Sequence, residues 1–184
     1  IPADAPLIGI VGRWQKYRKA EVFLEAAARV LKEESETRFV IIGCSGQMQE
    51  SVVQPLRALG LQEHVILPGY LIETYADALN ALDIFTLLMP GFDGTARAIR
   101  EAMALAKPCV VSDFGMLPEI VPDGVAGLVV PTDSQALAAA WLSLIRDAER
   151  RRRLGQGARA HACEHFAPQQ VAPALEAFYQ SLLA

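Results

Sequence analysis

The sequence has few of the features that mark several large classes of protein. It has three cysteines in 184 residues, and its formal net charge is −4. Charged residues interrupt every long apolar stretch, so that none reaches the roughly 20 residues that cross a bilayer. An acidic total argues against the broad basic surface that binds duplex nucleic acid, and we expect no nucleic-acid partner.

The cysteines are too far apart to form a metal cluster or a redox pair. Cys44, Cys109 and Cys163 form no CxxC, and we interpret them as small apolar side chains of a protein in a reducing, cytoplasmic compartment. His161 and His165 stand four residues apart beside Cys163, a spacing that can bind zinc. Because no further ligand is evident there, and the loops after the strands hold no metal cage, we expect no metal.

Enough apolar material is present for a single core. Hydrophobic residues make up 52% of the chain and charged residues 21%, which is typical of a globular protein and not of a disordered one. The length indicates one domain, over residues 1–184. Along it, short apolar runs alternate with longer stretches of helical periodicity.

This alternation predicts the fold class. Six apolar runs are expected to be strands: Leu7–Val11, Arg38–Ile42, His64–Leu67, Asp83–Met89, Pro108–Val111 and Gly127–Val130. Helices are expected at Ala20–Glu34, Met48–Leu59, Glu73–Leu82, Thr95–Ala106, Met116–Ile120, Ser134–Arg146, Glu149–His165 and Pro168–Leu183. Strands separated by helices indicate βαβ units, and apolar strands fit burial on both faces. We expect an α/β, Rossmann-like three-layer sandwich with a mostly parallel six-stranded sheet and helices on both faces.

The loop after the first expected strand is rich in cations. Arg13, Lys16, Arg18 and Lys19 follow Gly12 and precede a helix, and the N-terminus of a helix favours anions. This arrangement suits a diphosphate, although a solvated basic loop explains it about equally well. The dinucleotide fingerprint GxGxxG is not formed.

Two other loops after strands could approach a ligand. Gly43 and Gly46 follow the second strand, and glycine lets the backbone come close to a bound molecule. After the fourth strand, Asp93 and Glu101 flank a helix start, and carboxylate oxygens accept hydrogen bonds from sugar hydroxyls. The alternatives are a helix cap for Asp93 and a plain surface position for Glu101.

The same helix start offers free backbone N–H groups. Gly94, Thr95 and Ala96 stand where the first amides of a helix have no partner within it. Together with the two carboxylates, these amides favour a site for a phosphorylated sugar.

In this order, the motifs resemble the C-terminal, nucleotide-sugar-binding domain of the family 4 retaining glycosyltransferases, which are group 1 transferases with the GT-B fold. The resemblance covers nearly the whole chain. Its anchors are Val11-Gly12-Arg13 with Lys19, Gly43 with Gly46, Asp93 to Glu101, Pro108–Val111, Pro118–Val121, Asp123-Gly124 and Gly127–Pro131. The resemblance implies that the chain is the second lobe of a GT-B fold.

The resemblance also implies roles. Arg13 and Lys19 would neutralise the donor diphosphate, and Arg18 could share or take the role of Lys19. Glu101 would hold the ribose hydroxyls and Asp93 the transferred sugar. Gly12, Gly43, Gly46 and the amides of Gly94, Thr95 and Ala96 would border the donor, with the base beside the loop near Leu67–Tyr70. Catalysis would depend on Arg13, Lys19 and Glu101, with no metal and no tightly bound cofactor.

Two departures and an absence modify this expectation. Asp93 is one methylene shorter than the Glu usual in the family, which puts the identity of the sugar in doubt, and Ala106 replaces a usual glycine. Because Ile1 stands where the second lobe would begin, we expect that the acceptor-binding N-terminal domain is missing and that the chain alone is inactive. The remaining partners would be that lobe, a glycan or lipid-linked acceptor, and a membrane surface touched by the parent protein. The alternative is a stand-alone nucleotide-binding or regulatory module.

Overall fold

The computed structural model describes residues 2, 4–89 and 96–183 of the chain. Six strands form one sheet in the order β3-β2-β1-β4-β5-β6, and each neighbouring pair is parallel. The strands are β1 (Leu7–Val11), β2 (Arg38–Ile42), β3 (Val65–Gly69), β4 (Ile84–Leu87), β5 (Cys109–Ser112) and β6 (Gly127–Val130). The α/β, Rossmann-like arrangement expected from the sequence is confirmed.

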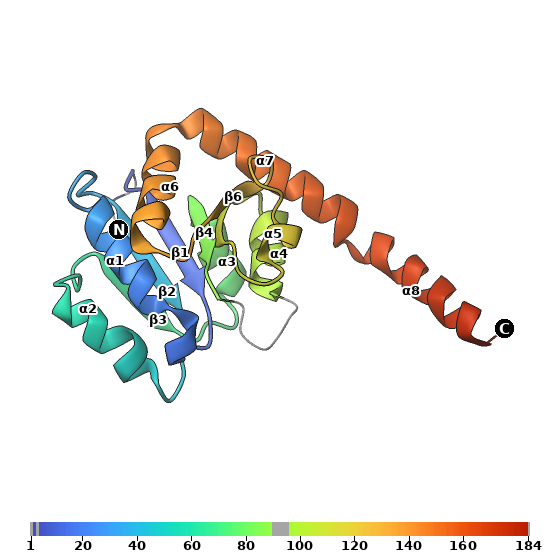
Figure 1. Cartoon of the computed structure of the whole chain (residues 1–184), viewed down its shortest axis with the longest axis horizontal. Helices are drawn as coiled ribbons and strands as arrows, with labels where there is room; N and C mark the ends of the chain where they lie inside the picture. Colours follow the sequence, from blue (N-terminus) through green and yellow to red (C-terminus); the bar gives the residue numbers. More distant parts are fainter. Residues whose placement is uncertain (1, 3, 90–95, 184) are drawn as a thin grey trace.

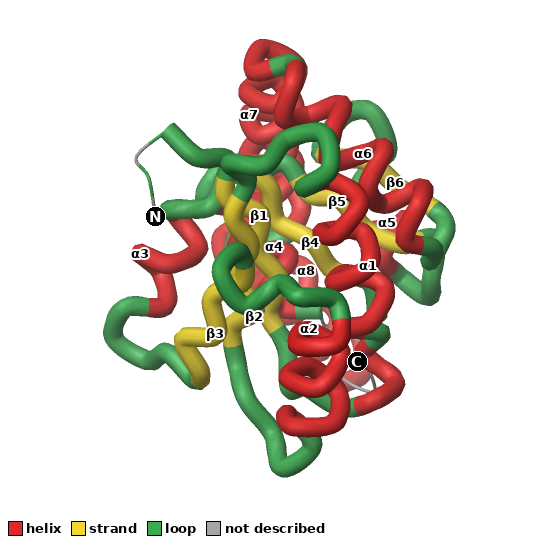
Figure 2. The backbone as a smooth tube through the Cα atoms, turned by 90° about the vertical axis from the view of Figure 1, so that its left-hand side faces the viewer, coloured by secondary structure: helices red, strands yellow, loops and turns green. Residues whose placement is uncertain are grey.

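Helices follow most of the strands. They are α1 (Ala20–Val30), α2 (Gln54–Ala58), α3 (Tyr75–Asn80), α4 (Arg97–Ala104), α5 (Leu117–Ile120), α6 (Ser134–Arg146), α7 (Ala148–His165) and α8 (Pro168–Leu183). A 3-10 turn, η1 (Lys16–Arg18), precedes α1, and a π-helical turn, η2 (Gln49–Val53), precedes α2. Figure 2 shows α3 on one side of the strands and α1 with α2 on the other, which gives the three layers.

Each strand divides its side chains between the two faces of the sheet. Phe39 and Ile41 of β2 belong to the apolar cluster that α1 and α6 cover, whereas Val40 and Ile42 belong to the cluster on the opposite face. Burial on both faces explains why the strands consist of continuous apolar runs. Trp141 of α6 anchors the first cluster and donates a hydrogen bond from Nε1 to Thr86 Oγ1 at 3.0 Å.

Several helices are shorter than expected, and two of the differences have clear local reasons. The helix expected over 48–59 is divided into η2 and α2, and Pro55, which has no N–H to donate, stands at the junction. The helix expected to reach Glu34 ends at Val30, because the N–H of Glu33 bonds to the Val30 carbonyl in a tighter turn.

The last helix lies apart from the rest. In Figure 1, α8 continues from α7 and projects away from the sheet, with the C-terminus at its end. Every residue of α8 is exposed. In the described part of the chain, no helix has both the length and the apolar character to cross a membrane.

Candidate functional site

The order of the strands places a crevice between β1 and β4. From β1 the chain continues outward to β2 and β3, and from β4 it continues in the other direction to β5 and β6. Ligands of parallel α/β sheets bind beyond the carboxyl ends of the strands where the order reverses. A cavity of about 780 Å³ lies at this place, bordered by the ends of β1, β2 and β4, by the loop after β3 and by the starts of α3 and α4. Its volume suits a small organic ligand.

Two glycines form the floor of the cavity. The N–H of Gly12 bonds to the Ile42 carbonyl at 3.1 Å, and the N–H of Gly43 bonds to the Gly69 carbonyl at 2.7 Å. Gly43 has φ +106°, and a β-carbon on it would overlap the carbonyl oxygen of Gly12. The ends of β1 and β2 can approach each other this closely because Gly43 has no side chain.

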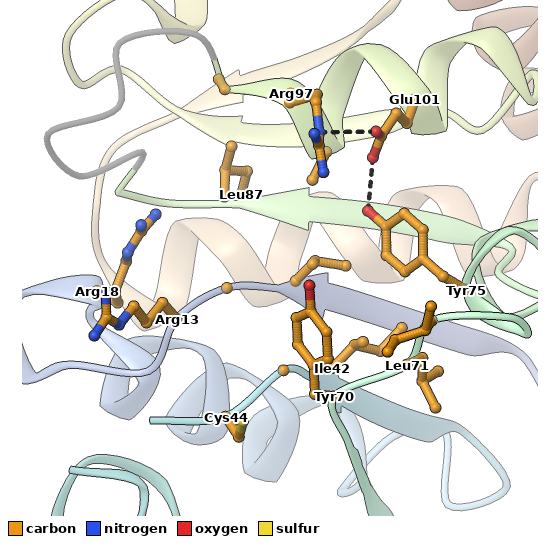
Figure 3. A pocket seen from close by; sticks show the side chains of 16 residues that line it. Arg13, Arg18, Ile42, Cys44, Tyr70, Leu71, Tyr75, Leu87, Arg97 and Glu101 are labelled. Carbon is orange, nitrogen blue, oxygen red and sulfur yellow. Dashed lines mark hydrogen bonds and ion pairs between the residues drawn. The ribbon is translucent and has the colours of Figure 1, made fainter. Parts of the chain in front are cut away.

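Arginines give the cavity its charge. Arg13, Arg18 and Arg97 line it, and Glu101 is the one acidic residue among the described lining residues. Arg18 donates a hydrogen bond from Nη1 to the Met89 carbonyl at 3.0 Å, which joins the loop after β1 to the end of β4. Figure 3 shows Arg13 and Arg18 on one side of the cavity and Arg97 with Glu101 on the other. This charge distribution fits an anionic ligand.

Glu101 is held by two neighbours. The Tyr75 hydroxyl donates a hydrogen bond to Oε2 at 2.7 Å, and Nε of Arg97 lies 3.1 Å from Oε1 (Figure 3). Burial raises the pKa of Tyr75 well above its ordinary value, and the hydrogen bond to the charged Glu101 raises it further. Tyr75 is therefore a hydroxyl donor throughout the physiological pH range.

Six of the expected site residues come together at the cavity. Gly12, Arg13, Arg18, Gly43, Ala96 and Glu101 all line it. Ala96 stands just before α4 in the left-handed conformation, with φ 41°, which is uncommon for a residue with a β-carbon.

Three of the expected residues lie elsewhere. Lys19 is outside the cavity lining, and its Nζ lies 3.6 Å from Glu21 Oε1. Gly46 is exposed in the next turn. Leu67 packs against the cluster under α1, so the loop after β3 reaches the cavity through Tyr70–Ile72. Arg18 therefore has the place at the cavity that the family pattern suggested for Lys19.

Asp93, Gly94 and Thr95, which the sequence assigned to the sugar and the phosphates, lie outside the described residues. Their roles stay predictions.

Tyr75 and Arg97 were not identified from the sequence. Arg97 stands four residues before Glu101, and opposite charges at this spacing on a helix form a pair, so that a signal was present. Tyr75 had none, because its role depends on the contact between α3 and α4.

The cluster of histidines at the end of α7 forms no recognisable metal site. The rings of His161 and His165 lie 4.2 Å apart, and Phe166 packs against His161. Across the ranges 4–89 and 96–183, no group of three or more His, Cys, Asp and Glu side chains is placed to hold a metal ion.

The chain matches a known protein family over most of its length. The family model described as glycosyl transferases group 1 matches residues 5–147. The chain is also similar to alpha-D-kanosaminyltransferase of Streptomyces kanamyceticus, with 27% identity over 156 residues. This match covers 84% of the chain and 40% of the relative, so the chain spans less than half the length of that enzyme.

Solved structures match over most of the chain. The C-terminal domain of the group 1 glycosyl transferase family protein LpcC from Francisella tularensis is 28% identical with a TM-score of 0.75, covering 88% of this chain and 86% of that one. HepE of Anabaena, solved with UDP and glucose, is 24% identical with a TM-score of 0.81, covering 94% and 48%. The second match shows the fold alone. The described sheet and its helices thus have the Rossmann-like architecture of GT-B glycosyltransferases.

Proposed function

Since the chain belongs to the group 1 glycosyl transferases, we propose that it is the part of such an enzyme that binds a nucleoside-diphosphate sugar. The observation that carries the proposal is the charge of the cavity, where, among the described lining residues, Arg13, Arg18 and Arg97 outnumber the one carboxylate, that of Glu101. Two adjacent phosphates provide the charge that these guanidinium groups bind well. HepE, solved with UDP and glucose, supports the choice of ligand through its similar fold.

Each chemical part of the donor is assigned to a different part of the proposed site. The diphosphate lies between Arg13 and Arg18, beside the amides at the start of α4. The ribose hydroxyls donate to Glu101, whose carboxylate accepts from paired hydroxyls. The base lies toward Tyr70, the first of the exposed residues that follow β3, and the transferred sugar lies toward Asp93.

In the proposed reaction the bond between the anomeric carbon of the sugar and the phosphate oxygen breaks. Its electron pair stays on the nucleoside diphosphate, where the arginines stabilise the developing charge. An acceptor hydroxyl forms the new bond to the same carbon and gives its proton to the departing phosphate oxygen, with retention of configuration and without a metal. The acceptor, a glycan or a lipid-linked sugar, is held by a further lobe of a longer enzyme, working in the cytoplasm or at a membrane surface. The 184 residues alone bind the donor without transferring it.

Isothermal titration calorimetry with UDP, GDP and ADP tests the binding. We expect at least one of them to bind, and Arg13→Ala to weaken it by about tenfold or more, since a charge-assisted contact to phosphate is lost. Arg152→Ala is the matched control, because Arg152 is exposed on α7 and is not part of the cavity lining. Failure of all three nucleotides to bind to the folded chain would refute the proposal. The chain would then have the fold of a donor-binding domain without binding a nucleotide.

The cysteines provide a test of where the nucleotide binds. Cys44 lines the cavity, Cys163 is exposed on α7, and Cys109 is buried in β5, where burial raises the pKa of its thiol. The bound nucleotide should slow alkylation of Cys44 by iodoacetamide while Cys163 reacts at its former rate, as followed by mass spectrometry. Equal rates at Cys44 with and without a bound nucleotide would show that the nucleotide binds at another place.

A further inference from the structure

The wall of the cavity contains a contact that joins two helices through Glu101. Tyr75 is the first residue of α3, and Glu101 lies on α4 with Arg97 one turn before it. The Tyr75 hydroxyl bonds to Oε2 at 2.7 Å, and Arg97 pairs with Oε1 at 3.1 Å. Each oxygen of the carboxylate therefore has its own protein partner.

The two partners differ in how firmly they can hold the carboxylate. The Arg97 side chain is 84% exposed, and an exposed ion pair within one helix contributes little. The Tyr75 ring is partly buried and packs against the apolar cluster on this face of the sheet. A hydrogen bond from a ring fixed in this way to a charged acceptor is among the stronger ones.

From this asymmetry, we propose that Tyr75 is a positioning residue for Glu101. It holds one oxygen of the carboxylate and thereby turns the other toward the ribose of the nucleotide, and the ribose hydroxyls displace Arg97 from that second oxygen. The inference rests on the proposed function, in which Glu101 accepts from the ribose hydroxyls. Holding the carboxylate in place before the ligand arrives reduces the side-chain entropy lost on binding.

The acceptor sites of the carboxylate permit this arrangement. Two oxygens offer about four lone-pair sites, and Tyr75 uses one of those on Oε2. When Arg97 leaves Oε1, the ligand hydroxyls find acceptor sites on an oxygen whose direction Tyr75 still fixes. Tyr75 remains protonated at neutral pH, since burial and the neighbouring carboxylate both raise its pKa.

The experiment compares UDP, or GDP or ADP if that nucleotide binds more tightly, with its 2′,3′-dideoxy analogue, which lacks both ribose hydroxyls. For the wild-type chain we expect UDP to bind more tightly than the analogue. Tyr75→Phe removes only the hydroxyl and should weaken UDP binding by about fivefold while changing that of the analogue by less than about twofold. Tyr179→Phe makes the same chemical change on the exposed helix α8 and should alter neither dissociation constant.

A double-mutant cycle distinguishes positioning of Glu101 by Tyr75 from a general disturbance of the residues that line the cavity. In a Glu101→Ala background, Tyr75→Phe should have no further effect on UDP binding, because the group that it positions is gone. Equal weakening of UDP and the dideoxy analogue would overturn the inference, and so would an undiminished effect of Tyr75→Phe in that background. Thermal unfolding of each variant shows whether a loss of binding reflects a loss of folding.

The outcomes also separate this inference from the proposed function. If the wild type binds no nucleoside diphosphate, both fail. If it prefers UDP over the dideoxy analogue and Tyr75→Phe keeps that preference, the proposed function stands and only the role of Tyr75 is refuted. A wild type that binds both ligands equally would refute the ribose contact of Glu101 and with it the inference.

Discussion

Gly12 and Gly43 bring the ends of two strands together at the floor of the cavity. A β-carbon on Gly43 would overlap the Gly12 carbonyl oxygen, and its φ of +106° is one that other residues rarely adopt. These are independent reasons for glycine at one position, one of space and one of backbone conformation. Gly46, the other glycine that follows β2, has open space around it.

This contrast gives a prediction at the scale of a single methyl group. Gly43→Ala should lower the free energy of unfolding by about 2–4 kcal/mol, because the backbone must shift and strain is added. Gly46→Ala should change it by less than about 0.5 kcal/mol, as is typical of an open surface site. Urea denaturation followed by circular dichroism measures both. A Gly43→Ala chain as stable as Gly46→Ala would show that the strand ends can separate at little cost.

Single residues also show how far the sequence could predict the site. Gly12, Arg13 and Gly43 directly follow strands, and Glu101 lies in the helix after one, and in a parallel sheet the loops after the strands meet at one edge. The direction of a side chain at that edge could not be predicted. Lys19 turns out to pair with Glu21, on the helix that it precedes, while Arg18 lines the cavity.

At the scale of elements, α7 and α8 show the difference between a helix that packs on the sheet and one that does not. Leu154 of α7 is 1% exposed within the core, whereas α8 has no buried residue. The apolar side chains of α8 recur at helical spacing and are all exposed: Val171, Leu175, Phe178, Tyr179, Leu182 and Leu183. The stability of the domain should therefore depend on α7 and very little on α8.

A truncation tests this division. A chain that ends at Ala167 should lose less than about 1 kcal/mol of unfolding free energy, because few of its buried contacts involve the removed helix. Leu154→Ala should lose about 2–5 kcal/mol, since it leaves a cavity in the core. Thermal and urea unfolding of the two proteins give the comparison. If truncation destabilised as much as Leu154→Ala, α8 would have to pack on the domain in solution.

Element boundaries were harder to predict than element types. Alternation of apolar runs and helical periodicity predicted six strands and their parallel pairing, since both follow from burial on two faces. It could not predict the π-helical turn before α2 or the early end of α1, because these depend on which backbone groups bond within a single turn. Nor could periodicity show that α8 would project, because an apolar stripe has the same pattern whether or not it is covered.

At the scale of the whole molecule, the overall charge and the charge of the site have opposite signs. The formal net charge is −4, yet the described residues lining the cavity include three arginines and one glutamate. At low salt the distant acidic surface repels an anionic ligand weakly, while the arginines attract it at short range. Because charges farther apart than about 10 Å are already largely screened at modest ionic strength, further salt acts mainly on the attraction between the phosphates and these partly exposed arginines.

The salt dependence of binding therefore tests the electrostatic part of the site. Raising the sodium chloride concentration from about 50 to about 500 mM should weaken UDP binding by about three- to tenfold, since the Debye length falls to about 4 Å, close to the distance between a guanidinium group and a bound phosphate. Uridine, which has no phosphate, should change by less than about twofold over the same range. In Arg13→Ala the dependence for UDP should be shallower, because one cation of the cavity is gone. Titrations of UDP and uridine that respond equally to salt would show that the arginines do not contact the phosphates, and that the cavity binds through its apolar and neutral polar groups.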